Sequence, residues 1–246
     1  MNITQGKQPR AQKVVIYGPE GIGKTTLASQ FPDPLFLDLE EGSSTMDVKR
    51  VEGIATWKQL GDTLTEIFYD TPICKTVVID TADKAEMLAT EAVCEEKGFK
   101  SIEDAGYGKG YTYLAEKMAS LISTLSLLVR RGINVVVIAH AAMRKFEQPD
   151  EMGAYDRWEL KLQKKVAPLL KEWADMVLFL NYKTKLIRSD KTNSVKARGG
   201  ERVIYASHNP CWDAKNRHGL PDEFALSYEP LKPIFEVINE KENDND

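Results

Sequence analysis

The sequence is poor in cysteine, and its cysteines form no recognisable framework. Cys74, Cys94 and Cys211 are odd in number, widely spaced and free of any Cys-x-x-Cys pair. Such spacing excludes the usual zinc motifs and the disulfide pattern of a small secreted domain. We therefore expect reduced thiols in the packed interior of a protein from a reducing compartment.

Long apolar runs and an excess of basic charge are also missing. No apolar stretch approaches the roughly 18 residues that cross a bilayer, and residues 1–13 contain no apolar signal core. We expect a cytoplasmic protein, in the host cytoplasm if a phage encodes it, with no membrane partner. Lys and Arg number 33 against 37 Asp and Glu, a formal net charge of −4. This balance argues against a globally basic nucleic-acid binder but leaves room for local basic patches.

The length and composition are those of an ordinary globular protein. The chain has 246 residues, of which 42% are hydrophobic and 28% are charged, which suffices to bury a full core. We expect a single domain over residues 13–235, preceded by a flexible N-terminus (1–12) and followed by an acidic, disordered tail (236–246).

Short, continuously apolar runs alternate with segments of helical spacing along most of this domain. The apolar runs at 13–17, 35–39, 76–79, 134–139, 174–181 and 202–206 predict strands. The segments after Lys24, at 57–68, at 83–97 and from a Gly-rich loop (106–110) through Leu128 predict helices. This alternation is typical of an α/β fold with a mostly parallel sheet covered by helices on both faces. We also expect a polar loop from 141 to 158 and a C-terminal β-hairpin region between 183 and 202.

The first predicted strand leads into a phosphate-binding motif. The pattern G-x-x-x-x-G-K-[ST] is matched from Gly18 to Thr25, between a predicted strand and a predicted helix, which is the context the motif requires. Backbone amides of such a loop converge on phosphate oxygens, and the helix N-terminus adds a favourable dipole. The order of the glycines excludes a dinucleotide fingerprint. We expect ATP to be bound by Gly18, Pro19, Glu20, Gly21, Ile22, Gly23, Lys24, Thr25 and Thr26.

Two residues of the motif and one distant acid have expected roles toward the phosphates and Mg²⁺. Lys24 would hold the β- and γ-phosphates, and Thr25 would bind Mg²⁺. Residues 77–80 form an apolar strand ending in Asp80, an arrangement that places an acid near the water shell of the metal. Asp80 is therefore the second expected Mg²⁺ residue, acting through water. The alternative is that Asp80 caps the helix that follows.

Three further segments extend this pattern. Glu40 follows the apolar residues of the second predicted strand, His140 follows the strand at 134–139, and a Lys-Asn-Arg-His-Gly segment occupies 215–219. Together with the phosphate-binding loop, these segments resemble the RecA-like P-loop ATPase core. Within that group, the chain is most similar to the phage single-strand annealing proteins of the RecA-like Sak type and to related phage ATP-binding proteins.

The resemblance implies a role for each of these residues. Glu40 would activate the attacking water, with Glu41 as the alternative base. His140 would sense the γ-phosphate, the alternative being a polar residue that only ends a strand. Lys215 and Arg217 would reach the γ-phosphate of a neighbouring subunit, so that hydrolysis requires a ring or filament of this chain. The alternative for this pair is a basic surface turn.

Three segments are candidates for contact with single-stranded DNA. They are the Gly-rich segment with its interleaved aromatic and basic residues, the segment after His140, where the family places a DNA-contacting loop, and the basic stretch 183–202. A packed turn or a solvated loop is the alternative reading of such segments. The candidate residues are Tyr107, Lys109, Arg144, Lys145, Lys183, Lys185, Arg188, Lys196 and Arg198.

These features favour a Mg²⁺-dependent ATPase that acts on single-stranded DNA in phage-type recombination, promoting annealing or strand pairing. Oligomerisation and the DNA strand would activate it, and a single-strand-binding protein is a further expected partner. The alternative is a nucleotide-switched loader or assembly ATPase whose partner is another protein, which the acidic overall charge favours. A small-molecule kinase is a weaker alternative, because the sequence has no Arg-rich lid.

Overall fold

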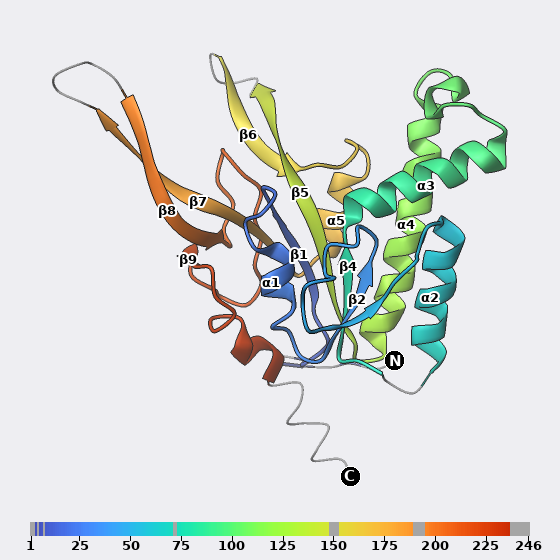
Figure 1. Cartoon of the computed structure of the whole chain (residues 1–246), viewed down its shortest axis with the longest axis horizontal. Coiled ribbons are helices and arrows are strands. Elements are labelled where there is room, and N and C mark those ends of the chain that lie inside the picture. The colour runs from blue at the N-terminus through green and yellow to red at the C-terminus, as the bar shows by residue number, and fades with distance from the viewer. Residues whose placement is uncertain are drawn as a thin grey trace, which may run out of the picture.

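The computed structural model describes residue 3 and residues 5–6, 8–70, 73–147, 153–188 and 195–236, without the side chains of 184–188 and 195–198. Figure 1 shows a twisted sheet with long helices on one side and two hairpins that project from it. Of the predicted acidic tail, only Glu236 falls within the described residues. Across these residues, no helix combines the length and apolarity that spanning a membrane requires.

Among the described residues, nine strands form one sheet in the order β3-β2-β4-β5-β1-β7-β8-β9, with β6 paired to β5. The pairs among β1 to β5 and β7 are parallel, whereas β6, β8 and β9 are antiparallel to their neighbours. The predicted mostly parallel sheet is confirmed, as is the predicted C-terminal β-hairpin region. The strands are β1 (Lys13–Gly18), β2 (Pro34–Asp38), β3 (Lys49–Val51), β4 (Thr76–Asp80), β5 (Asn134–Glu147), β6 (Ala154–Leu160), β7 (Met176–Arg188), β8 (Val195–Tyr205) and β9 (Glu223–Ala225).

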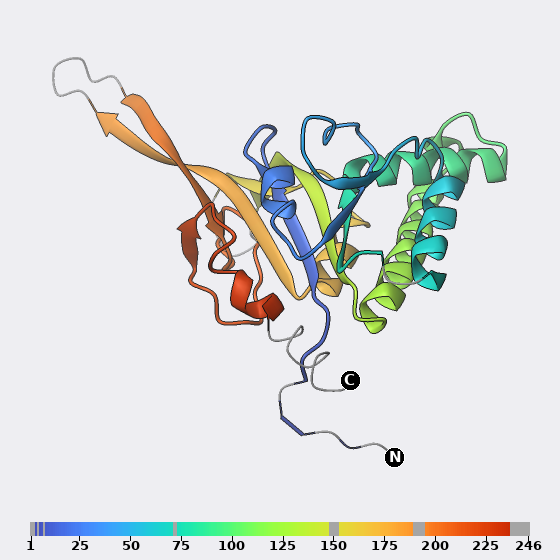
Figure 2. The ribbon, with the colours of Figure 1, turned by 60° about the horizontal axis from the view of Figure 1, so that its bottom comes forward.

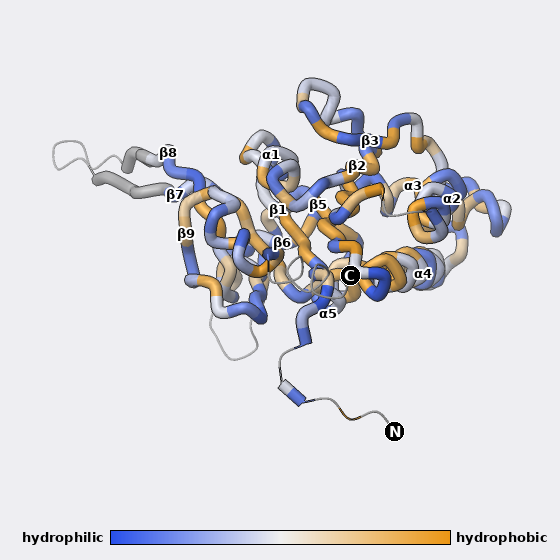
Figure 3. Tube along the Cα trace, turned by 90° about the horizontal axis from the view of Figure 1, so that it is seen from below, coloured by the Kyte–Doolittle hydropathy of each residue, from blue (hydrophilic) through white to orange (hydrophobic). Residues whose placement is uncertain are grey.

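Successive side chains of the central strands enter two separate cores, because they point to opposite faces of the sheet. On β1, Val15 and Tyr17 lie in one core and Val14 and Ile16 in the other, all fully buried. Four helices cover the first core, while the short α1 and the segment 228–235 cover the second. Figure 3 shows the apolar strands β1 and β5 between α1 and the pair α4 and α5. The helices are α1 (Lys24–Ala28), α2 (Trp57–Tyr69), α3 (Ala82–Lys97), α4 (Lys109–Arg130) and α5 (Ala167–Trp173), with a 3₁₀ helix η1 (Ile102–Ala105).

The predicted polar loop 141–158 is wrong, because residues 141–147 and 154–158 belong to two paired antiparallel strands. Strand β5 continues past His140 and pairs with β6 down to the bridge between residues 147 and 154. Arg144 and Phe146 of β5 lie on the same face as their partners Arg157 and Tyr155 of β6, because alternate residues of a strand share a face. The ring centroids of Phe146 and Tyr155 lie 5.6 Å apart, and the guanidinium of Arg157 lies 5.1 Å from the Phe146 ring.

The predicted Gly-rich loop 106–110 also needs correction at its C-terminal end. Lys109 and Gly110 belong to the first turn of α4. A Cβ on Gly110 would lie 1.8 Å from the carbonyl oxygen of Ile102, so α4 approaches η1 at a distance that only glycine permits. Tyr107 stays in the turn, with its side chain fully exposed.

Packed residues begin before the predicted domain boundary at Lys13. Ala11 and Gln12 are buried, and the backbone N–H of Gln12 donates to Oδ1 of Asn134 at 2.8 Å. Arg10 forms an ion pair with Asp175 at 2.7 Å. The predicted flexible segment is therefore docked on the sheet from Arg10 onward.

Candidate functional site

The phosphate-binding loop lies at the carboxyl edge of the sheet, between β1 and α1. Gly23, the residue before α1, has a φ of 110°, in the region that favours glycine. No side chain caps this helix start, so its first N–H groups remain available to a ligand. This is the backbone arrangement that binds phosphate at a helix N-terminus.

Lys24 projects into the loop that precedes it. Its ammonium donates to the carbonyl oxygens of Gly18 at 3.1 Å and Pro19 at 3.0 Å, and its side chain is buried. Burial lowers the pKa of Lys24, while the carboxylates of Asp80 and Asp83 act in the opposite direction. The Lys24 ammonium is thus held by two loop carbonyls. A bound phosphate can take the place of these carbonyls as its hydrogen-bond partner.

Thr25 and Asp80 lie in direct contact, although 55 positions separate them in the chain. The Thr25 hydroxyl donates to Oδ2 of Asp80 at 2.9 Å. Burial raises the pKa of Asp80 to about 6, and the hydrogen bond from Thr25 opposes this shift. The helix that follows is capped by Thr81, whose hydroxyl accepts from the N–H of Lys84. The alternative reading of Asp80 as the helix cap is therefore wrong.

A hydroxyl and a carboxylate are the oxygen donors that Mg²⁺ prefers. Within the described part of the chain, no group of three or more His, Cys, Asp or Glu side chains could hold a metal by itself. The Thr25 and Asp80 pair therefore fits a Mg²⁺ ion that takes its remaining ligands from water and from substrate phosphates, as this ion commonly does.

Glu40 lies beside the end of β4. Its Oε1 accepts a hydrogen bond from the Thr81 hydroxyl at 2.7 Å, so the carboxylate stands next to Asp80 along the sheet edge. Glu40 and Glu41 are both exposed, and Glu41 has a left-handed φ of 57°. The two acids therefore differ in placement, with Glu40 held at the site.

Asp38 fixes the turn that carries Glu40, a role that the sequence did not indicate. Its buried carboxylate accepts from the N–H groups of Gly42 and Ser43 at 3.0 and 2.9 Å, and from the Ser43 hydroxyl. The Gly-Ser pair at 42–43 is itself a turn signal, but the carboxylate that holds the turn comes from the end of β2, four and five residues earlier. The second missed residue is Thr81, which holds the Glu40 carboxylate.

His140 lies directly beside the phosphate-binding loop. It pairs with Gly18 in the parallel ladder between β5 and β1. Its backbone N–H donates to Oδ2 of Asp83 at 2.8 Å, its ring Nδ1 is 3.6 Å from Oδ1, and burial raises the pKa of Asp83. Its carbonyl accepts from Lys161, at the base of the β5–β6 hairpin. His140 thus connects the loop, the start of α3 and the hairpin, and Asp83 is a partner that the sequence did not identify.

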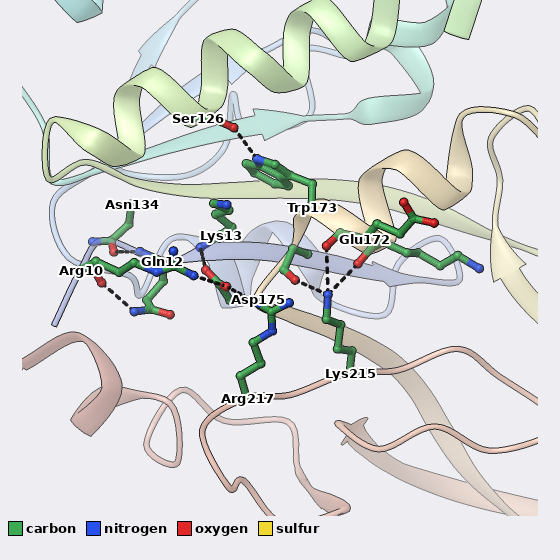
Figure 4. Close-up of polar contacts among 12 residues, drawn as sticks. Arg10, Gln12, Lys13, Ser126, Asn134, Glu172, Trp173, Asp175, Lys215 and Arg217 are labelled. Atoms are coloured by element: carbon green, nitrogen blue, oxygen red, sulfur yellow. Dashed lines mark hydrogen bonds and ion pairs between the residues drawn. The ribbon is translucent and has the colours of Figure 1, made fainter. Parts of the chain in front are cut away.

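The structure does not bring Lys215 and Arg217 to the phosphate-binding loop of their own chain. Figure 4 shows the Lys215 ammonium against three carbonyls at the end of α5, at 2.6 to 3.1 Å, and burial lowers its pKa. Arg217 pairs with the buried Asp175 at 3.1 Å, a carboxylate that it shares with Arg10. Asp175 accepts from the N–H of Lys13, at the start of β1 and therefore at the opposite edge of the sheet from Gly18.

The DNA candidates lie on different elements. Arg144 donates to the carbonyl of Leu162 at 2.8 Å, and the exposed Lys145 lies opposite Asp156 on the β5–β6 hairpin. Lys183 forms an ion pair with Glu223. The backbones of Lys185, Arg188, Lys196 and Arg198 lie on β7 and β8, and their side chains are outside the described residues. Lys109 lies elsewhere, at the start of α4, and Tyr107 lies in the turn just before it. Figures 1 and 2 show that β7 and β8 extend far beyond the sheet.

These contacts define a P-loop NTPase. Lys24 lies against the loop that precedes it, and the next residue, Thr25, is hydrogen-bonded to Asp80 at the end of another parallel strand. The AAA domain family matches residues 10–218, and the chain belongs to this family. The match includes every site element described above from Gly18 to Arg217.

One bacterial protein and two solved structures are similar to the chain at low sequence identity. Over 173 residues the chain is 27% identical to the SPbeta prophage-derived uncharacterized protein YorG of Bacillus subtilis (strain 168), covering 68% of this chain. The matched part covers 50% of that relative, so the chain spans about half of its length. Among solved structures, a KaiC-like protein of Pyrococcus horikoshii OT3 is 14% identical with a TM-score of 0.43, over 80% of this chain and 79% of that one. The flagellar accessory protein FlaH of Methanocaldococcus jannaschii is 8% identical with a TM-score of 0.38, over 80% and 78%.

Proposed function

We propose that this protein is a Mg²⁺-dependent ATPase that acts on single-stranded DNA in phage-type recombination, like the RecA-like Sak-type annealing proteins. The observation that carries the ATPase proposal is the contact of Thr25 with Asp80 at 2.9 Å, with Glu40 held beside them by Thr81. Phosphoryl transfer to water needs phosphate positioning, a metal site and a carboxylate for the water. All three lie at one edge of the sheet.

The residues of this chain then have distinct tasks. Lys24 exchanges its loop carbonyls for the β- and γ-phosphates, and Glu40 orients water for attack and accepts its proton. When bound, Mg²⁺ supplies neutralising charge on the phosphates. His140, beside Gly18, registers whether the γ-phosphate is present and passes this state to the β5–β6 hairpin through its backbone.

The DNA-directed part of the proposal is supported by the two hairpins and by the prophage origin of a relative. Strands β5 and β7 flank β1, and both continue beyond the end of β1 into antiparallel hairpins. A strand of DNA held by the hairpins would lie on the nucleotide side of the sheet. The basic composition of residues 183–202 suits phosphate contact.

A loader or assembly ATPase that binds another protein is the second candidate function. The observation that favours it is the lack of net basic charge on the β5–β6 hairpin, where Glu147, Asp156 and Glu159 balance Arg144, Lys145 and Arg157 on the described strands. The formal net charge of −4 points the same way.

The proposed function is tested by steady-state ATP hydrolysis with and without single-stranded DNA, at several protein concentrations. We expect stimulation by the strand and a steep concentration dependence. Lys24→Ala should abolish ATP binding, whereas Glu40→Gln should keep binding and lose at least a hundredfold in turnover. Glu41→Gln is the matched control and should turn over ATP normally.

Two results would redirect the proposal. Turnover that ignores DNA, together with nucleotide-dependent assembly, would favour the loader. Normal turnover by Glu40→Gln with loss in Glu41→Gln would move the base to Glu41.

A further inference from the structure

Two arginines share one buried carboxylate at the amino edge of the sheet, opposite the phosphate-binding loop. Arg10 and Arg217 both donate to Oδ1 of Asp175, at 2.7 and 3.1 Å, and Figure 4 shows their side chains approaching it from different sides. The Asp175 side chain is 2% exposed, whereas the two arginine side chains are 52% and 55% exposed. Each guanidinium carries several N–H donors and uses only one nitrogen on Asp175. Both cations can therefore bind a further anion on their exposed sides.

The surroundings of this pair are strongly positive. Burial lowers the pKa of Lys13, Asp175 opposes this shift, and three neighbouring arginines add to it. Burial and then Arg217 lower the pKa of Lys215. The carboxylates that act on these two lysines are Asp175 and Glu172. They stand against five cations, which we call the basic surface: Arg10, Lys13, Arg130, Lys215 and Arg217.

The last described segment of the chain ends at the same edge of the sheet. Phe235 is buried in the core that also contains Val14 and Met176. These two residues directly follow Lys13 and Asp175 in the sequence. Figures 1 and 2 both show the C-terminal helical turn, in red, beside the chain that leads into β1. The chain therefore leaves its described part close to the basic surface.

The next ten residues, 237–246, carry acids at every second position. They lie outside the described structure, and their acids are Glu240, Glu242, Asp244 and Asp246, with Lys241 as a single cation. In an extended chain, alternate side chains point to the same side, so the four carboxylates would form one acidic side with a spacing of roughly 7 Å. Ten extended residues reach roughly 33 Å. This segment has the charge, pattern and reach to lie along the basic surface.

We propose that the acidic segment 237–246 binds the basic surface of its own chain, with its carboxylates on the exposed donors of Arg10 and Arg217. A single exposed ion pair is weak, but the short tether keeps the segment at an effective concentration on the order of millimolar, and several pairs form together. While the segment is bound, Arg217 is covered and is not available to a neighbouring copy. This effect on assembly rests on the proposed function, whereas the contact itself does not.

Cleavage by trypsin after Lys241 measures the contact directly, because a bound segment is cut more slowly than a free one. We expect Arg10→Gln and Arg217→Gln each to release residues 242–246 at least threefold faster than wild type at low ionic strength. Lys100→Gln, at an exposed position between α3 and α4, is the matched control and should leave the rate unchanged. Salt at about 0.5 M should remove the differences, because it screens exposed charges. Thermal unfolding checks that each variant is folded.

The effect on assembly is measured by ATP turnover at increasing protein concentration, without DNA. A variant with a neutral segment should reach half-maximal turnover at a concentration at least threefold below that of wild type, because Arg217 is then uncovered. This variant combines Glu240→Gln, Glu242→Gln, Asp244→Asn and Asp246→Asn. A control variant removes the same charge from exposed positions on α2 and α3 and should keep the wild-type midpoint. It combines Asp62→Asn, Glu66→Gln, Glu91→Gln and Glu95→Gln.

The outcomes separate the contact from its effect and from the function beneath it. Equal release rates in wild type, Arg10→Gln and Arg217→Gln would overturn the contact. Faster release in both variants, together with an unchanged midpoint for the neutral segment, would keep the contact and overturn its effect on assembly. Equal midpoint shifts in the neutral-segment and control variants would overturn that effect as well. If wild type hydrolyses no ATP at any concentration, the proposed function fails, whereas the release rates still decide on the contact.

Discussion

At the scale of single residues, Asp80 is a carboxylate that the fold destabilises in its charged form. Burial raises its pKa to about 6 from an ordinary 3.8, and the nearby Asp38 and Glu40 add to the effect. Above pH 6 the group is ionised in both the folded and the unfolded chain, so the folded state bears the full cost of the buried charge. Below pH 4 the group is protonated in both states and the cost vanishes.

Asp80→Asn should therefore stabilise the nucleotide-free protein. The amide oxygen can still accept from Thr25, and the buried charge is gone. We expect the free energy of unfolding to rise by ~3 kcal/mol above pH 6, with a gain that shrinks to zero as the pH falls toward 4. Urea denaturation without Mg²⁺ between pH 4 and 8 measures this gain.

The matched control for this substitution is Asp47→Asn, at an exposed site, which should change stability little at any pH. A gain in Asp80→Asn that does not depend on pH would contradict the electrostatic explanation, and a loss at pH 8 would show that the carboxylate is needed for folding. Either result would be visible in the same titration.

At the scale of elements, the β7–β8 hairpin is connected to the phosphate-binding loop. The β7–β8 hairpin has a register shift between Tyr182 and Thr184, just where it leaves the sheet. Such an irregularity increases the local twist and can redirect the projecting part. Arg202 lies opposite Tyr182 at this point and contacts the phosphate-binding loop. The hairpin is thus connected to the nucleotide site through one side chain.

Removing positive charge from this hairpin should weaken binding of single-stranded DNA. We expect the combined variant with Lys185, Arg188, Lys196 and Arg198 changed to Gln to lose affinity and to lower the slope of log K against log salt by up to about 3, since each phosphate contact contributes about 0.7. ATP affinity should stay unchanged. Fluorescence anisotropy of a labelled oligonucleotide at several salt concentrations measures both quantities.

A variant with Lys49, Lys58, Lys100 and Lys232 changed to Gln removes the same charge from exposed positions elsewhere. It controls for the general effect of net charge on association. Equal weakening in both variants would leave the hairpin without a specific role. An unchanged slope in the hairpin variant would show that other residues contact the phosphates.

At the scale of the whole molecule, the position of Arg217 bears on assembly. It cannot serve the loop of its own chain from the opposite edge of the sheet, so a catalytic role requires a neighbouring copy. Within one chain it is paired with Asp175, together with Arg10. A trans role therefore requires Arg217 to leave this pairing on assembly.

Mixing two inactive variants tests the trans role. Arg217→Ala and Glu40→Gln should each lose turnover, whereas an equimolar mixture should regain about a quarter of the wild-type rate, because one interface in four combines both intact residues. Arg10→Ala is the control, since it removes the other partner of Asp175. A structural role alone predicts similar losses in Arg10→Ala and Arg217→Ala, and no recovery on mixing.

The sequence by itself determined the α/β class, most strand and helix positions and the residues of the phosphate-binding loop. These features depend on local patterns: apolar runs, helical spacing and a motif of eight consecutive positions. Asp80 was also found locally, since it ends an apolar run, whereas the role of Glu40 came from the resemblance to the RecA-like core. The structure places both beside the loop because the carboxyl ends of parallel strands meet at one edge.

Only the tertiary structure decided which distant residues meet. The order of strands puts β5 between β1 and β4 and thus His140 beside Gly18. It also brings Arg202 to Ile22 across 180 positions, and turns Arg217 toward Asp175. The hairpin of β5 and β6 was predicted as a polar loop because its sequence is rich in charge. Its strands form through backbone pairing and through packing on one face, which the charge pattern does not show. Such contacts depend on chain topology, which no local pattern records.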